Sequence, residues 1–192
     1  FTHMVAKRIA RRAPDIPIVD YVLPSVWAWR LGRARAMKKY IRRVLALLPF
    51  EPKFLGTVGV DCVYVGHPAI QRIPEEGSGA RFRAARGIGA DDPVLLVLPG
   101  SRLNEVKHLV GIFGDTVRRL SREIDRLRVV VPVVPHVRPL VEASVEGWGV
   151  PVEIVDDERE KRAAFDAGTA ALAASGTVSL ELALARVPMV VA

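Results

Sequence analysis

The chain has 192 residues, of which 50% are hydrophobic and 26% are charged. This composition is typical of a folded globular protein and excludes an intrinsically disordered one. The formal net charge of +7 suits an anionic partner, namely a phosphorylated substrate, an anionic membrane surface or nucleic acid, and equally suits solvated basic helix faces. The single cysteine, Cys62, excludes an internal disulfide and is compatible with a reducing cytoplasm.

The sequence contains no stretch that predicts a membrane span or a targeting signal. No uninterrupted apolar run approaches the roughly 20 residues that cross a bilayer. The first residues also lack the basic segment followed by an apolar run that is typical of a signal peptide. We therefore expect a cytoplasmic protein whose contact with a membrane is peripheral.

The first 68 residues alternate between predicted helices and strands. We expect a basic helix at 2–12, a strand at 16–23, a helix at 32–43, a strand at 44–48, a helix or turn from Pro49, and a strand at 60–65. The strands are apolar with little polar alternation, which is typical of strands covered on both faces. Residues 69–93 hold several glycines and prolines and, at 81–86, one short charged helix. We interpret this segment as an interdomain connection.

A second series of strands and helices begins at Val94. After the strand 94–98, a stripe of apolar residues with spacings of one, three and four runs from Val106 to Ile124 and predicts one long helix. Further strands are predicted at 129–134, 152–155, 170–174 and 188–192, with helices at 139–146, 158–165 and 178–185. This alternation is typical of parallel sheets with crossover helices.

The arrangement predicts an α/β chain with two Rossmann-like domains, both incomplete. The first domain, 1–68, lacks early strands, and in the second, 94–192, the last strand ends at the final residue. We therefore expect a segment of a longer two-domain protein.

The first candidate site is the turn after the strand 94–98. It contains Gly100, Ser101 and Arg102, and Glu105 lies in the first turn of the following helix. Glycine permits close backbone approach, a helix N-terminus presents unpaired N–H groups, and arginine can hold two phosphate oxygens. The alternative is a tight turn in which Ser101 or Asn104 caps the helix and Glu105 complements its dipole. Local chemistry supports both interpretations equally.

The second candidate site is the turn after the strand 170–174. It contains Ser175, Gly176 and Thr177, and Glu181 lies one helical turn past Thr177. A carboxylate at that position can accept hydrogen bonds from both hydroxyls of a ribose while the turn holds phosphate; the alternative is a helix-dipole partner. Because ligands of open α/β sheets bind outside the carboxyl ends of the strands, two such turns together favour a nucleotide diphosphate site.

Several other site types are not supported by any motif. Neither turn carries the dinucleotide fingerprint or a Walker loop, and the sequence has no Gly-x-Ser-x-Gly nucleophile elbow. The four histidines, His3, His67, His108 and His136, do not have metal-ligand spacing. We therefore expect neither a metal nor a cofactor.

An aromatic loop follows the strand 16–23. Trp27, Trp29 and Arg30 suit a sugar ring, an acyl chain or a phosphate, and the alternative is that the tryptophans pack between sheet and helix. His67, between a glycine and a proline, is interpreted as a structural residue or as a hydrogen-bonding group at the rim of a cleft.

Six strings along the chain resemble one family, that of the lipid-A-disaccharide synthases. They are residues 24–30 (PSVWAWR), 45–51 (LALLPFE), 65–68 (VGHP), 98–102 (LPGSR) with Glu105, 174–177 (ASGT) with Glu181, and 187–191 (VPMVV). The turns are shared by many nucleotide-sugar enzymes, whereas the SVWAWR and LPFE strings are much more specific. The resemblance covers nearly the whole chain.

The resemblance implies an inverting glycosyltransferase of the GT-B type, with two Rossmann-like domains. Such an enzyme joins UDP-2,3-diacylglucosamine to 2,3-diacylglucosamine 1-phosphate, forms the β-1′,6-linked lipid A disaccharide and releases UDP. It implies no metal, because helix termini and Arg102 balance the departing diphosphate. It also implies a protein peripheral to the cytoplasmic face of the inner membrane of a Gram-negative bacterium, with its basic early half against anionic lipids.

The resemblance also places the proposed catalytic base upstream of Phe1. We therefore expect the isolated segment to have little or no transferase activity. Arg42, Thr169 and Leu31 depart from the residues usual in the family.

Two other functions stay open, as does the oligomeric state. The first alternative is another UDP-sugar enzyme of the same fold, such as a 2-epimerase or a peptidoglycan glycosyltransferase. The second is an inactive nucleotide-binding fragment. Nucleic acid is not expected as a partner, because no reader motif is present and only 6% of residues are aromatic. A homodimer is left open.

Overall fold

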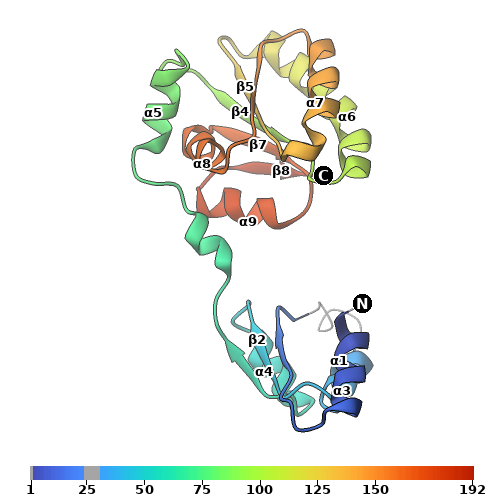
Figure 1. Ribbon diagram of the computed structural model, residues 1–192. Helices are drawn as coiled ribbons and strands as arrows, with labels where there is room; N and C mark the ends of the chain where they lie inside the picture. The colour runs from blue at the N-terminus through green and yellow to red at the C-terminus, as the bar shows by residue number, and fades with distance from the viewer. Residues whose placement is uncertain (1, 24–30) are drawn as a thin grey trace. The chain divides into compact units, whose positions relative to one another are not determined.

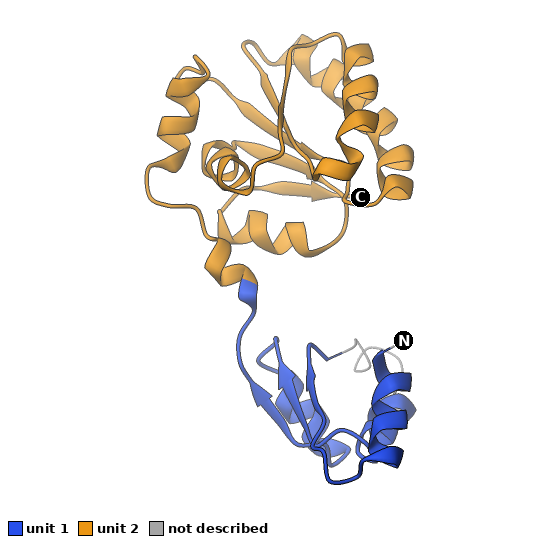
Figure 2. Cartoon of the chain, in the orientation of Figure 1, with its two compact units in different colours: residues 1–68 blue, residues 69–192 orange. Residues whose placement is uncertain are grey.

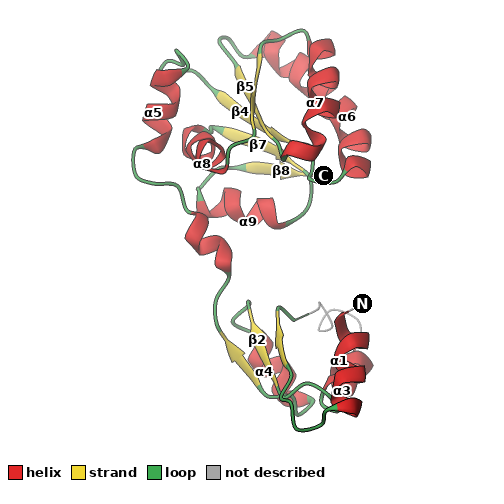
Figure 3. Cartoon of the chain, in the orientation of Figure 1, coloured by secondary structure: helices red, strands yellow, loops and turns green. Residues whose placement is uncertain are grey.

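The computed structural model describes residues 2–23 and 31–192. The chain divides into two units, Phe1–Pro68 and Ala69–Ala192, which are blue and orange in Figure 2. Each unit is built on a parallel sheet accompanied by helices (Figure 3). The predicted α/β class with two Rossmann-like units is therefore confirmed.

Unit 1 contains a three-stranded parallel sheet in the order β1-β2-β3. Its strands are β1 (Val19–Tyr21), β2 (Arg43–Ala46) and β3 (Cys62–Tyr64), and its described helices are α1 (Thr2–Arg12), α3 (Leu31–Met37) and α4 (Glu51–Thr57). Met37, Val44 and Leu55 are fully buried in its core. The buried Glu51 accepts a hydrogen bond from the backbone N–H of Leu48 at 2.9 Å, which ties the start of α4 to the turn before it.

Four elements of unit 1 are shorter than predicted. The strand expected at 44–48 is β2, of four residues, and the strand expected at 60–65 is β3, of three residues. The strand expected at 16–23 is reduced to β1, because Pro17 lacks a ladder donor and Val22 turns the chain with a φ of 75°. The helix expected at 32–43 ends at Met37, and Arg43 already belongs to β2.

Unit 2 contains a five-stranded parallel sheet in the order β6-β5-β4-β7-β8 (Figure 1). The strands are β4 (Val94–Leu98), β5 (Arg128–Pro132), β6 (Val152–Val155), β7 (Ala170–Ala173) and β8 (Met189–Val191). The helices and 3-10 turns are η1 (Pro68–Arg72), α5 (Ser78–Ala85), α6 (Leu103–Glu123), η2 (Pro135–Val137), α7 (Arg138–Val145), η3 (Glu146–Trp148), α8 (Glu158–Ala167) and α9 (Thr177–Leu184). The chain runs outward from β4 to β6 and then returns to the other side of β4, so the strand order reverses between β4 and β7.

The central strand β4 is buried along its whole length because helices cover both faces of the sheet. Leu95 and Val97 pack on one face, in a cluster with residues of α6, α7 and η3. Leu96 and Leu98 point to the opposite face and pack with residues of α5, α8 and α9. The alternation of a strand therefore explains why the continuous apolar run 94–98 is required here.

Residues 69–93 pack as part of unit 2 rather than as a bare connection between domains. Phe82 of α5 is 3% exposed and belongs to the core beneath α8. A Cβ on Gly79 would lie 2.6 Å from the backbone carbonyl carbon of Asp166, so α5 and α8 touch through their backbones. The Asp166 carboxylate also accepts hydrogen bonds from the Gly79 N–H and the Ser78 hydroxyl. The buried residues of α5 are Ser78, Gly79 and Phe82, and Phe82 stands between two arginines, so the sequence has no sustained apolar run that would indicate this packing.

None of the helices that the structure describes combines the length and the apolarity needed to cross a membrane.

Candidate nucleotide-binding site

The two predicted turns lie at the carboxyl ends of β4 and β7, which are hydrogen-bonded neighbours in the sheet. A pocket of about 280 Å³ opens between them. All eight residues predicted for a donor site line it, namely Gly100, Ser101, Arg102, Glu105, Ser175, Gly176, Thr177 and Glu181. The pocket therefore sits where the strand order reverses, which is the usual ligand position in an open α/β sheet.

The backbone of the first turn requires glycine. Gly100 has a φ of 118°, and a Cβ there would lie 2.7 Å from the Cβ of Glu105. The Glu105 carboxylate accepts long hydrogen bonds from the backbone N–H groups of Ser101 and Arg102, at 3.3 Å each, and pairs with the Arg102 guanidinium. Hydrogen bonding from Arg102 lowers the pKa of Glu105 below its ordinary value. Glu105 thus caps α6, and the Arg102 side chain stays largely exposed at the pocket rim.

The second turn is held by two hydrogen bonds to backbone carbonyls. The Ser175 N–H donates to the carbonyl of Ala192 at 2.9 Å, and the Ser179 hydroxyl donates to the carbonyl of Gly176 at 2.6 Å. Ser175, Gly176 and Thr177 remain exposed, at the point where α9 begins. The N-termini of α6 and α9 therefore both border the pocket, and each places the positive end of its helix dipole there.

Glu181 is the one buried carboxylate in the pocket lining, at 6% exposure. Its Oε1 lies 2.6 Å from Nη1 of Arg72, and its Oε2 lies 2.9 Å from Nζ of Lys161. Burial acts to raise the pKa of Glu181, but hydrogen bonds from Lys161 and Arg72 outweigh it and lower the pKa below the ordinary 4.5. The carboxylate is thus held ionised beside the pocket.

Two cations near this site were not predicted from the sequence. Lys161 lines the pocket from α8, and Arg72 reaches Glu181 from η1. Both belong to charged or irregular segments whose local pattern predicts only solvated side chains. No sequence signal singles them out, because their role depends on contacts made across the fold.

The remaining predicted site residues lie elsewhere in the chain. Trp27, Trp29 and Arg30 fall outside the described residues. His67 lies in unit 1, half-buried, shortly after β3. Within residues 2–23 and 31–192, no group of three or more histidine, cysteine, aspartate or glutamate side chains is arranged to hold a metal ion.

The reversed strand order and the pocket between two glycine-containing turns define a Rossmann-like protein with a candidate ligand site. Two solved structures share the fold. A UDP-GlcNAc 2-epimerase from Neisseria meningitidis matches with a TM-score of 0.65 and 14% identity, over 95% of this chain and 54% of that chain. WaaG, a glycosyltransferase involved in lipopolysaccharide biosynthesis, matches with a TM-score of 0.52 and 16% identity, over 97% of this chain and 62% of that chain.

The chain belongs to the lipid-A-disaccharide synthetase family, whose model matches residues 1–192. A lipid-A-disaccharide synthase of Rhodopseudomonas palustris strain CGA009 is 54% identical over 100% of this chain, and one of Rhodospirillum centenum is 49% identical over 100% of it. The chain spans about half the length of these relatives, 49% and 48% respectively.

Proposed function

We propose that this chain forms the nucleotide-binding part of a lipid-A-disaccharide synthase. The reaction would transfer 2,3-diacylglucosamine from UDP-2,3-diacylglucosamine to 2,3-diacylglucosamine 1-phosphate. Family membership over the full chain supports this activity. The observation that carries the site assignment is that two turns far apart in the sequence line one pocket at the strand-order reversal.

The pocket offers a chemically distinct region for each part of UDP. Arg102 and the N–H groups at the starts of α6 and α9 suit the diphosphate. The ionised Glu181 suits the ribose hydroxyls as a double acceptor. Leu98, Val133 and Val178 add apolar lining that suits the base.

In a transfer with inversion, the main role of these pocket residues would be to stabilise the negative charge on the departing UDP. The acceptor 6-hydroxyl oxygen bonds to the donor anomeric carbon while the bond from that carbon to the diphosphate breaks on the opposite face. The electron pair leaves with UDP, where Arg102 and the helix termini face the new negative charge. The hydroxyl proton passes to a base that we do not assign to any of the 192 residues.

The proposal also includes the acceptor and the membrane. We assign Trp27, Trp29, Arg30 and His67 to the acceptor side. The exposed basic residues of α1, Lys7, Arg8, Arg11 and Arg12, suit peripheral contact with anionic lipids. This would place the protein at the cytoplasmic face of the inner membrane of a Gram-negative bacterium.

In a complete enzyme that contains this chain, Arg102→Ala and Glu181→Ala are each expected to weaken UDP binding by about 1.5–3 kcal/mol, because each removes a charge-assisted hydrogen bond to the ligand. Isothermal titration of UDP against each variant measures the loss. Arg122→Ala, in the last turn of the same helix as Arg102, is the matched control and should bind UDP like the wild type. Unchanged UDP affinity in both pocket variants would remove the site assignment.

The proposed reaction can be tested in a chimera. Residues 1–192 replace the matching segment of the Rhodopseudomonas palustris relative, and synthesis of the β-1′,6 disaccharide is assayed in detergent micelles. We expect synthesis by the chimera and little or none by the isolated chain, which spans about half of that relative. Turnover of water-soluble UDP-N-acetylglucosamine at a comparable rate would favour the epimerase or peptidoglycan alternatives. Robust synthesis by the isolated chain would contradict the expectation that transfer also requires the part of the cleft that the rest of the relative supplies.

A further inference from the structure

The buried carboxylate of the pocket is bracketed by two cations that come from different elements. Arg72 at the end of η1 contacts one oxygen of Glu181, and Lys161 of α8 contacts the other. Glu181 itself lies on α9, with a side chain that is 5% exposed. Each carboxylate oxygen therefore has one cation and at least one lone pair left over.

The two cations are not equivalent. Arg72 does not line the pocket, and its side chain is 52% exposed. Lys161 does line the pocket, and its side chain is only 16% exposed. Its ammonium nitrogen lies 5.6 Å from the centre of the Phe165 ring, which belongs to the core one turn further along α8. Lys161 is thus the cation that a ligand in the pocket would meet beside Glu181.

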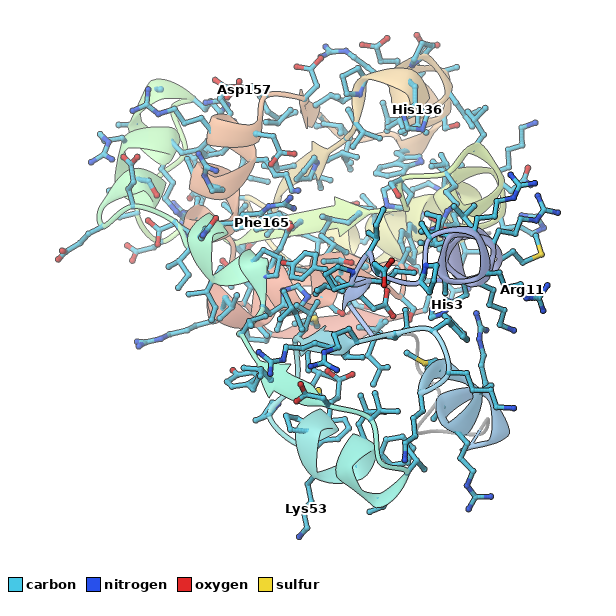
Figure 4. The ribbon with its side chains drawn as sticks, turned by 60° about the horizontal axis from the view of Figure 1, so that its bottom comes forward. His3, Arg11, Lys53, His136, Asp157 and Phe165 are labelled. Atoms are coloured by element: carbon cyan, nitrogen blue, oxygen red, sulfur yellow. The ribbon has the colours of Figure 1, made fainter. Side chains whose placement is uncertain are left out.

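The position of Lys161 follows from how α8 is built. The Asp157 carboxylate caps the helix by accepting hydrogen bonds from the backbone N–H groups of Arg159 and Glu160, at 2.9 Å each. Figure 4 labels Asp157 at this cap and Phe165 on the same helix. With the start of α8 capped and Phe165 buried, the helix is held at both ends and its fourth residue is directed toward Glu181.

We propose that Lys161 is a donor-positioning residue, which holds the Glu181 carboxylate in the orientation that accepts the ribose hydroxyls of the nucleotide. This inference rests on the proposed function. Lys161 occupies one acceptor position of Oε2 and Arg72 one of Oε1, which leaves each oxygen of this pocket-lining carboxylate a further acceptor position for a ribose hydroxyl. Without Lys161, the Glu181 carboxylate keeps only Arg72 as a charged partner, at Oε1, and its side chain gains rotameric freedom.

The charged groups that surround Glu181 determine how its titration responds to a substitution. They are Arg72 and Lys161, and behind them Glu158, whose Oε1 lies 3.6 Å from the Lys161 nitrogen. The hydrogen bond from Lys161 is the largest influence that lowers the pKa of Glu181. Removing it leaves burial opposed mainly by Arg72, so the pKa of Glu181 should rise and its protonated form should appear at a higher pH.

The test compares Lys161→Met with the wild type in titrations of UDP and of 2′-deoxy-UDP between pH 4 and pH 8. We expect a loss of UDP affinity of roughly 5- to 30-fold for Lys161→Met at pH 7. We expect a smaller loss of affinity for 2′-deoxy-UDP, because that ligand lacks one of the two ribose hydroxyls that would donate a hydrogen bond to Glu181. The acid limb of the UDP affinity profile should also move to higher pH in the variant, and Lys161→Arg should restore part of the affinity.

A double-substitution cycle and a control complete the design. In a Glu181→Gln background, Lys161→Met should have little further effect, because the group that Lys161 positions is already altered. Lys107→Met, an exposed lysine of α6 that does not line the pocket, should leave both titrations unchanged. Lys161→Gln, which keeps most of the side-chain length, replaces Lys161→Met should the latter fail to fold.

The outcomes separate this inference from the function on which it rests. An equal loss for UDP and 2′-deoxy-UDP, or an undiminished loss in the Glu181→Gln background, would mean that Lys161 acts on the phosphates or on the fold and would overturn the inference alone. Absence of UDP binding by the wild-type protein would overturn the proposed function and the inference with it.

Discussion

Phe165→Ala is expected to lower the free energy of unfolding of unit 2 by about 3–5 kcal/mol. Phe165 is 2% exposed and packs between the sheet and α5, in the same core cluster as Phe82 and Leu96. Truncation to alanine removes the buried ring and leaves a cavity in its place. Because α5 and α8 already touch through their backbones at Gly79, these helices cannot move closer together to fill the cavity. Because the ring also lies beneath Lys161, UDP affinity should fall together with stability.

The measurement requires a signal from unit 2 alone. The chain has three tryptophans, and only Trp148 belongs to unit 2. In a Trp27→Phe and Trp29→Phe background, urea unfolding followed by Trp148 fluorescence therefore reports on that unit. Ile112→Ala, at a position 61% exposed on α6, is the control and should change the free energy of unfolding by no more than about 0.5 kcal/mol. A loss below about 1 kcal/mol for Phe165→Ala would contradict the burial of this ring in the core of unit 2.

Two glycines three residues apart on α6 are expected to respond to alanine with opposite signs. A Cβ on Gly114 would lie 2.3 Å from Nε1 of Trp148, a ring that is 2% exposed and enclosed by the core. Gly114→Ala should therefore cost about 1–3 kcal/mol through overpacking. Gly111 has no atom within 4 Å of its ideal Cβ position, so Gly111→Ala should stabilise the helix by up to about 1 kcal/mol.

The same urea experiment measures both variants, and each serves as the control for the other. The two substitutions make the same chemical change in the same helix, so helix propensity contributes equally and the difference isolates the contact with Trp148. A gain in stability for Gly114→Ala would show that α6 can move away from η3 at little cost. A loss for Gly111→Ala would show that this face of α6 is covered.

The sequence by itself determined those features of this protein that depend on neighbouring residues. The run 94–98 is apolar at every position, and the stripe from Val106 repeats at helical spacing, so β4 and α6 could be predicted together with the turn between them. Because parallel strands share one carboxyl edge, the turns at Ser101 and Ser175 could also be expected to face one site. The structure brings both into a single pocket.

Only the tertiary structure decided which side chains complete that pocket. Arg72 and Glu181 are 109 positions apart, and their pairing depends on η1 meeting α9. Lys161 reaches Glu181 because α8 is capped by Asp157 and anchored by Phe165 on the face of the sheet that α9 also covers. Local patterns report on spacing along one helix or strand, whereas these contacts arise from packing between elements. The partners of a buried charge are therefore not visible in the sequence around it.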